Sequence, residues 1–305
     1  MQIIKGKYTD FELFKNDVRD WDLNFNILSK QDFYASFKMV ISEDFLLSRE
    51  VLNGKIEHSG LSPIGFKTLV IPVEYNNSEF VWYNKKSQSK EMLLFPKNNI
   101  IDVVTFNGLD LFFLSIRETR LMEAINKLGF LNCKDFFNSD EVSIKIDSKF
   151  TIYFNQLANT ILNSANQNTE YSYSVLNNIV YLILKQIENS KPVYRQKQKV
   201  KKEIALRKAI EIINEKQDVL YSVQDLCGLV GVSEKTLFTA FKEKYKVSPS
   251  EYLKSLRLNK VKHEIENIKH KDINISTIAG KYHFWHMGQF AKDFRKHFGI
   301  LPSEV

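Results

Sequence analysis

The sequence predicts an α+β chain, with an antiparallel β-barrel or roll in its first part and an all-helical last third. Three observations predict this division. Short apolar runs separated by turn-forming residues recur between residues 33 and 116, which is typical of antiparallel sheets. Residues 203–305 instead carry apolar residues at helical spacing, and one helix-turn-helix pattern occurs there twice. A polar, basic stretch at residues 190–202 separates the two parts and reads as a linker.

The size and composition favour a folded protein of about two domains. The 305 residues exceed one typical domain of roughly 100–200 residues, and the 44% hydrophobic content argues against disorder. Cys133 and Cys227 lie far apart, so we expect neither a disulfide framework nor a zinc site, and a reduced cytoplasmic setting fits best. The N-terminus lacks the apolar core of a signal peptide, and no stretch approaches the roughly 18 apolar residues of a membrane span.

The first 117 residues read as one helix followed by strands. Phe11, Phe14, Val18 and Trp21 have helical spacing and predict an amphipathic helix over residues 10–22. About seven or eight strands then follow, at residues 33–40, 45–52, 66–73, 80–83, 92–95, 101–106 and 109–116. Turn signals such as Asn53-Gly54 and Asn107-Gly108 separate these strands. We expect an antiparallel sandwich or barrel, in the form of a cupin-like roll, between about residues 30 and 117.

A roll of this kind can enclose a ligand pocket in its interior. Five aromatic residues are candidates for the lining, although a place in the core is the simpler interpretation for each of them: Phe66, Phe80, Trp82, Tyr83 and Phe112. Metal-dependent chemistry needs several His and carboxylate ligands at fixed geometry. His58 is the only histidine in this half, so we expect no metal and place His58 on a surface or loop. No motif of a catalytic or phosphate-binding site occurs, so we expect no enzyme and no cofactor.

Three helices are expected between the strands and the linker, at residues 118–128, 150–162 and 175–187. The last one is apolar over a wide arc and must bury more than one face. It either packs on the roll with one face and on a partner subunit with the other, or lies inside a helical bundle. The first alternative implies a homodimer.

The helix-turn-helix pattern first appears at residues 223–245. An apolar helix reaches a turn at Gly231, and Ser233 can cap the following helix, in which Leu237 and Phe241 repeat four residues apart. The second copy has an apolar helix up to about Ala279, a turn, and a helix with apolar residues at the same spacing. A long helix over residues 249–268 should hold the two copies in register.

The positive charge of the chain belongs to this last third. Residues 200–305 hold 19 Lys and Arg against 13 Asp and Glu, whereas residues 1–199 are close to neutral. A compact basic domain with two helix-turn-helix units is expected to neutralise the phosphates of nucleic acid. Without those units, a solvated basic surface would be the simpler interpretation.

These residues resemble the AraC/XylS family of bacterial transcription regulators. The resemblance covers about residues 204–305 and rests on Pro249, Tyr252-Leu253, Arg257-Leu258, Ile278-Ala279, Phe284, Phe290, Phe294, Phe298-Gly299 and Pro302-Ser303. Residues 284–290 are most similar to the branch of ethanolamine-operon regulators. Two positions depart from the family pattern: His283 stands where glycine is usual in the second turn, and Val261 where alanine is usual in the long helix.

The resemblance implies that the second helix of each unit enters the major groove of double-stranded DNA. In the first unit, Lys235, Phe238 and Thr239 are the expected base contacts. Gln289 and Lys292 are the corresponding candidates in the second unit, and helix starts near Ser233 and His286 should bind phosphate. The remaining candidates on these helices are Thr236, Lys242, Met287 and Arg295. We expect Cys227 to be a buried core thiol and Trp285 to pack at the turn.

The whole chain therefore reads as a cytoplasmic transcription regulator, more specifically an activator that contacts RNA polymerase. Residues 1–189 would sense an unknown small molecule and dimerise, with helices at 118–189; residues 190–202 would link them to the DNA-binding domain, residues 203–305. Two alternatives remain. A protein partner could control the N-terminal domain instead of a small molecule, or that domain could be a cupin-like enzyme fused to a DNA-binding domain.

Overall fold

The computed structural model describes the chain except for residues 10, 12, 15–21, 30–32, 74–78, 84, 88–89, 97–99, 107, 140–141, 165–168, 192, 195–200, 216–218 and 268–273. The chain forms two compact units. Unit 1 comprises Met1–Asn24, Phe33–Asn53 and His58–Gln196. Unit 2 comprises Phe25–Asp32, Gly54–Glu57 and Lys197–Val305. Two short N-terminal stretches thus group with the C-terminal helices.

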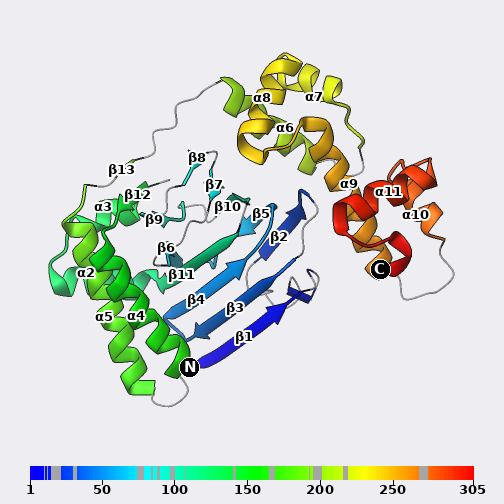
Figure 1. Ribbon diagram of the computed structural model, residues 1–305. Coiled ribbons are helices and arrows are strands. Elements are labelled where there is room, and N and C mark those ends of the chain that lie inside the picture. The colour runs from blue at the N-terminus through cyan, green and yellow to red at the C-terminus, as the bar shows by residue number, and fades with distance from the viewer. Residues whose placement is uncertain are drawn as a thin grey trace. The chain divides into compact units, whose positions relative to one another are not determined.

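Unit 1 is built on a large antiparallel sheet (Figure 1). Its described strands lie in the order β1-β3-β4-β11-β6-β9-β12-β13. Their bounds are Gln2–Tyr8, Ala35–Ile41, Phe45–Leu52, Leu109–Arg117, Phe66–Pro72, Glu91–Leu94, Val142–Lys145 and Val193–Tyr194. The central strands β4 and β11 pair from Leu52 opposite Leu109 to Phe45 opposite Ile116. This register fixes which side chains share each face of the sheet.

A smaller sheet has the order β2-β5-β10-β7-β8. Its strands are Asp22–Ile27, Ile56–Leu61, Ile100–Thr105, Phe80–Trp82 and Lys85–Lys86. In the described residues each sheet has two end strands, and a closed barrel has none. The expected antiparallel strands are confirmed, and the described strands divide into two open sheets, so of the two expected arrangements closure into a barrel is not what the structure shows.

Helices cover one face of the large sheet (Figure 1). They are α2 (Glu118–Leu128), α3 (Cys133–Phe137), α4 (Ser148–Ser164) and α5 (Thr169–Glu188). Alternate strand residues such as Leu47, Phe112 and Leu114 join the helices in one apolar core. Packing these apolar strand residues under the helices removes a large apolar area from water.

Helix α5 lies inside this bundle. Its apolar arc, which includes Ile179, Ile183 and Leu184, is buried in the same core as residues of α2, α3 and α4. Its outward residues include Tyr171 and Tyr181, both about half exposed. The bundle-internal alternative therefore accounts for the wide apolar arc, and the arc does not require a partner subunit.

Unit 2 is helical in its C-terminal part. Its helices are α6 (Lys201–Glu215), α7 (Val223–Val230), α8 (Glu234–Tyr245), α9 (Pro249–Asn267), α10 (Ile275–Lys281) and α11 (Met287–Phe298), followed by the short 3₁₀ helix Pro302–Glu304. The 19 residues of α9 span about 28 Å. Helix α9 contributes side chains to the cores of both helix-turn-helix units. Tyr252 packs on Phe241 of α8, and Leu258 and Val261 pack with residues of α10 and α11. Val261 is fully buried, so the departure from alanine is accommodated.

Several elements differ from the sequence prediction. Strands β1, β2, β5 and β12 and the short helix α3 were not expected, and α6 starts at Lys201, inside the expected linker. Phe11 and Phe14 are helical and buried, as predicted, whereas most of residues 10–22 lies outside the described residues. Cys227 is buried, as expected for a core thiol.

Candidate DNA-binding surface

The first helix-turn-helix unit is held by matched caps at both helix starts. Ser222 accepts a hydrogen bond from the backbone N–H of Asp225, and the Asp225 carboxylate accepts one from the Ser222 backbone N–H at 2.8 Å. This capping box satisfies two backbone donors that a helix start otherwise leaves free. Gly231 then has φ of 69°, the left-handed conformation that lets the chain turn into α8. Ser233 caps α8 by accepting from the N–H of Thr236.

Helix α8 buries one face and exposes the other. Leu237, Ala240 and Phe241 are buried, so the residues between them point outward. Lys235, Phe238 and Thr239 are exposed, and the Phe238 ring keeps 48% of its surface in contact with solvent. An exposed phenyl ring between a lysine and a threonine is suited to contact a thymine methyl. The structure thus brings the three expected base-contacting residues of this unit onto one exposed face.

The other candidates on α8 already have partners within the unit. The hydroxyl groups of Ser233 and Thr236 lie 3.0 Å apart in the cap. Thr239 donates its hydroxyl to the Lys235 carbonyl at 2.8 Å, so its methyl group remains for apolar contact. Lys242 forms an ion pair with Glu251 at 3.4 Å and must leave it to reach a phosphate.

The second unit turns without glycine. His283 has φ of 62°, so an imidazole-bearing residue occupies the left-handed region where glycine is favoured. Asn274 caps α10 by accepting from the Ser276 N–H at 3.0 Å. Helix α11 follows His286, whose side chain makes no capping hydrogen bond. The backbone N–H groups at the start of α11 therefore remain available for a phosphate oxygen.

Helix α11 has the same division of faces. Phe290 and Phe294 are buried in a core shared with α9 and α10, and the outward residues His286, Gln289, Lys292 and Arg295 are exposed. Met287 is half-buried and packs against this core, so it differs from the other candidates. Gln289, Lys292 and Arg295 follow one another at intervals of three on the outward side of the helix, and His286 stands directly before its start.

One exposed ring, that of Trp285, is not predicted by the sequence. Trp285 was expected to pack at the turn, but 71% of it is exposed. Its ring meets that of His283 edge-on at 5.6 Å, and it stands directly before α11. The one signal in the sequence for an unusual turn at this point is His283, which stands where glycine is usual. An exposed indole beside a helix that can enter a groove is a further candidate contact with DNA.

The expected pocket residues of unit 1 do not form one group. Phe80, Trp82, Tyr83 and the neighbouring Phe95 pack edge to face around Trp82. Phe112 lies instead on the helix-covered face of the large sheet, 5.5 Å from the ring of Phe154. Phe66 is half-buried under the guanidinium of Arg117 at 5.0 Å. Phe112 and Phe66 therefore have packing roles apart from the Trp82 cluster.

The face of the large sheet opposite the helices carries buried polar side chains. The pairing registers place Ser48, Glu50, Thr68, Ser115 and Ser143 on it, and we call these five residues the polar face. Thr68 and Ser115 share a hydrogen bond at 2.9 Å, and Ser48 donates to Glu50 at 3.2 Å. The buried hydroxyl of Ser143 has no hydrogen-bond partner among the described residues. Desolvation raises the pKa of Glu50 to about 7.

His58 lies in strand β5 rather than on a loop, which corrects its expected position. Its Nε2 is 3.4 Å from the hydroxyl of Thr105, and Thr105 pairs with Phe80 and so shares a sheet face with Phe80 and Trp82. Desolvation lowers the pKa of His58 to about 4, so the ring is neutral at physiological pH. The described residues contain no group of three or more His, Cys, Asp or Glu that could hold a metal ion.

The sequence comparisons with known proteins each cover about the last third of the chain, and the structural comparison covers most of it. Residues 226–305 match a family described as a helix-turn-helix domain. The XylDLEGF operon transcriptional activator 2 of Pseudomonas putida is 29% identical over 98 residues, which cover 32% of this chain and 62% of that protein. A probable thc operon regulatory protein of Rhodococcus erythropolis is 26% identical over 99 residues, 32% of this chain and 30% of that protein. The AraC-like transcriptional activator CuxR aligns over 85% of this chain and 94% of its own at 11% identity, with a TM-score of 0.46.

The sequence match spans less than two thirds of the length of the two operon regulators. Residues 226–305 form a helix-turn-helix domain, and the two relatives from Pseudomonas putida and Rhodococcus erythropolis are named as regulators of operons. Among the described residues, no helix is both long and apolar enough to cross a membrane.

Proposed function

We propose that this chain is a sequence-specific DNA-binding transcription regulator that reads two successive major-groove segments with α8 and α11. One observation carries the proposal: two helix-turn-helix units share the continuous helix α9, and each presents an exposed face with polar side chains on its second helix. The length of α9, about 28 Å, approaches the 34–36 Å between successive major-groove faces. Domains of the AraC type bind double-stranded DNA, and Ser233 and His286 stand where phosphates would meet the two helix starts.

The test is selection of binding sites from random duplexes with the full chain, followed by Lys235→Ala and Gln289→Ala. Each substitution should relax base preference at one half of the site and cost about 1–3 kcal/mol there. Lys208→Ala is the matched control, because Lys208 is an exposed lysine on α6, outside both recognition helices. Equal losses for Lys208→Ala and Lys235→Ala would reduce α8 to a non-specific basic surface.

We further propose that unit 1 binds a small-molecule effector in its interior, as a cupin-like roll does. The polar face supports this, because buried hydroxyl and carboxyl groups cost free energy unless they gain hydrogen bonds. Ser143 lacks a partner among the described residues, and Glu50, whose pKa lies near 7, can donate or accept. A ligand with several hydrogen-bonding groups, seated near the Trp82 cluster, would satisfy them. The effector can change the DNA affinity of the regulator only by the factor by which its own affinity differs between two forms of the regulator.

A thermal-shift screen of the full chain tests the effector proposal, with amines, amino acids, sugars and fatty acids. Ethanolamine belongs in the screen, because the second unit is similar to the ethanolamine-operon branch. At about 100 times its dissociation constant, a ligand should add roughly 2.7 kcal/mol of stability. Glu50→Gln should weaken the hit and the exposed Glu43→Gln should not. A negative screen together with a stoichiometric co-purified protein would favour control by a protein partner; turnover of a hit would favour an enzyme.

The remaining assignments follow from the same proposal. The regulator would act in the cytoplasm as an activator that contacts RNA polymerase, with residues 1–189 sensing and dimerising and residues 203–305 binding DNA. Transcription from a selected site, with and without the effector, tests activation. Sedimentation of the full chain tests the homodimer, for which exposed tyrosines of α4 and α5, such as Tyr153 and Tyr181, are the available aromatic surface.

A further inference from the structure

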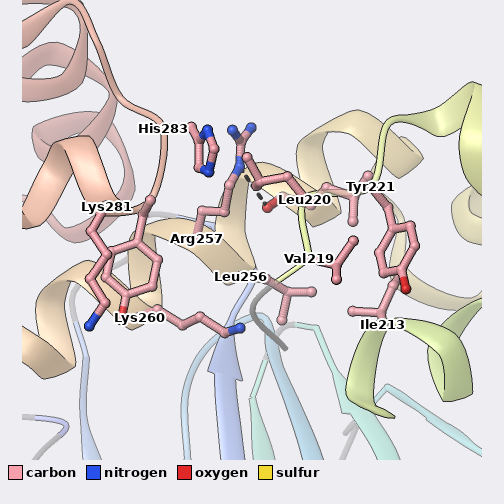
Figure 2. Close-up of a pocket in the computed structure, with 11 residues that line it drawn as sticks. Ile213, Val219, Leu220, Tyr221, Leu256, Arg257, Lys260, Lys281 and His283 are labelled. Carbon is pink, nitrogen blue, oxygen red and sulfur yellow. Dashed lines mark hydrogen bonds between the residues drawn. The ribbon is translucent and has the colours of Figure 1, made fainter. Parts of the chain in front are cut away.

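A pocket lies between the two helix-turn-helix units, within the helical part of unit 2 (Figure 2). Its volume is about 270 Å³, and eleven residues line it. The first unit contributes Ile213 and the segment Val219–Tyr221, which immediately precedes the Ser222 cap of α7. The second contributes Lys281, Tyr282 and His283 at the end of α10. Helix α9 supplies the wall that joins them.

The lining divides into a basic part and an apolar part. Arg257, Lys260, Lys281 and His283 supply nitrogen atoms, and none of the eleven lining residues is Asp or Glu. Val219, Leu220, Leu253 and Leu256 supply apolar carbon, and Val219 and Leu220 are substantially exposed. Figure 2 shows the terminal nitrogens of Arg257 beside His283, with Leu256 and Val219 along the other side. The chemistry of the lining therefore fits a molecule with one anionic end and one apolar end.

Arg257 is the centre of the basic part. Its guanidinium lies 5.3 Å above the ring of Phe284, and its Nε donates a long hydrogen bond of 3.4 Å to the Leu253 carbonyl. Desolvation lowers its pKa, and no acidic partner of Arg257 occurs among the described residues. A partly desolvated guanidinium gains most from a carboxylate, because its planar fork matches the two oxygens. Lys281, by contrast, is already paired with Glu264 at 2.9 Å.

We propose that this pocket binds a small amphiphilic carboxylate, with its carboxylate on Arg257 and its apolar body against Val219, Leu220 and Leu256. The volume lies just below the range of drug-sized sites, about 300–1,000 Å³, which suits a molecule the size of a medium-chain fatty acid or an aromatic acid. An inorganic or DNA phosphate would meet the basic part and leave the apolar part empty. This site does not depend on an effector in unit 1.

The position of the pocket couples ligand binding to DNA affinity. An occupant touches the segment before α7 and the turn after α10 together, so it biases the relative placement of α8 and α11. Any difference in ligand affinity between the free and DNA-bound forms appears as an equal and reciprocal change in DNA affinity. The carboxylate would thus act on the DNA-reading unit directly.

The experiment measures thermal shift and calorimetric binding on the full chain with octanoate. Octanamide, acetate and inorganic phosphate are the comparison probes, since each lacks either the charge or the apolar body. Octanoate should stabilise the protein with saturation, and the three other probes should not. Equal stabilisation by octanamide, or by phosphate alone, would overturn the proposal, because the recognised feature would be only apolar or only anionic.

Single substitutions test whether octanoate binds in this pocket. Arg257→Gln should weaken octanoate binding at least tenfold, and Arg207→Gln should leave it unchanged, because Arg207 lies on α6 and pairs with Glu211. Leu220→Asp, at an exposed position, should also abolish binding without disturbing the core. Circular dichroism checks that each variant is folded. Octanoate binding that survives both Arg257→Gln and Leu220→Asp would place the ligand elsewhere and overturn the proposal. Selection of DNA sites with the unliganded chain tests the proposed DNA binding separately, so the two proposals can fail independently.

Discussion

The two helix-turn-helix units solve the same geometric problem with different residues. The first turns at Gly231 and has a capping box on α7 and a serine cap on α8. The second turns at His283, has an asparagine cap on α10, and starts α11 without a side-chain cap. The first unit therefore uses residues that favour its conformation, whereas the second holds an unfavourable backbone angle through its packing around Phe290 and Phe294. The difference shows that packing contacts can stabilise a helix-turn-helix where the turn glycine and a side-chain cap are missing.

The largest expected effect is on the two cores. Phe241→Ala and Phe294→Ala should each lower the free energy of unfolding by about 3–5 kcal/mol, because both rings are fully buried. Phe241 packs on Tyr245 and Tyr252, and Phe294 on Phe290 and Phe298. Urea unfolding measures the loss, and footprinting on a selected site should show which half is affected. If either variant fails to protect both halves of the site from cleavage, the two units fold as one.

The turns should respond in opposite directions. Gly231→Ala should destabilise by about 1–2 kcal/mol, because a Cβ there meets no atom within 4 Å and only the left-handed φ is penalised. His283→Gly should be neutral or stabilising by roughly 0.5 kcal/mol, since glycine relieves the same penalty at some entropic cost. Gly228→Ala is the control: it lies inside α7 with open space around it and should stabilise by about 1 kcal/mol. Destabilisation by His283→Gly would show that the imidazole contact with Trp285 outweighs the strain.

Removal of a cap should have a smaller effect. Ser222→Ala should cost about 1 kcal/mol in unfolding experiments, because it leaves the Asp225 N–H without its acceptor. The hydrogen bonds from Ser222 also lower the pKa of Asp225. A lowered carboxyl pKa stabilises the fold at pH values above the unfolded pKa, and this contribution is lost as the pH falls through the folded pKa. The cost of Ser222→Ala should therefore shrink in acid; an unchanged cost at low pH would contradict the role of the carboxylate.

Prediction from the sequence was most successful where a pattern is local. Helices α2, α7, α8, α9 and α11 follow from spacing, caps and glycines, and the outward face of α8 follows from Leu237 and Phe241 alone. The prediction missed β1, β2 and β5, because a strand without clear alternation is defined by its partner in the sheet. It also misplaced Phe112, His58 and Trp285, whose surroundings depend on segments distant in the chain.

The sequence by itself therefore determined the pair of helix-turn-helix units and the residues on their outward faces, because helical periodicity and capping act within a few residues. Only the tertiary structure decided that the strands divide into two open sheets, that helices cover one face of the large sheet while the opposite face carries buried polar side chains, and that Arg257 faces a pocket with apolar walls. Those features arise from strand pairing and from packing between distant segments. The energies that select among such arrangements belong to contacts that no local pattern encodes.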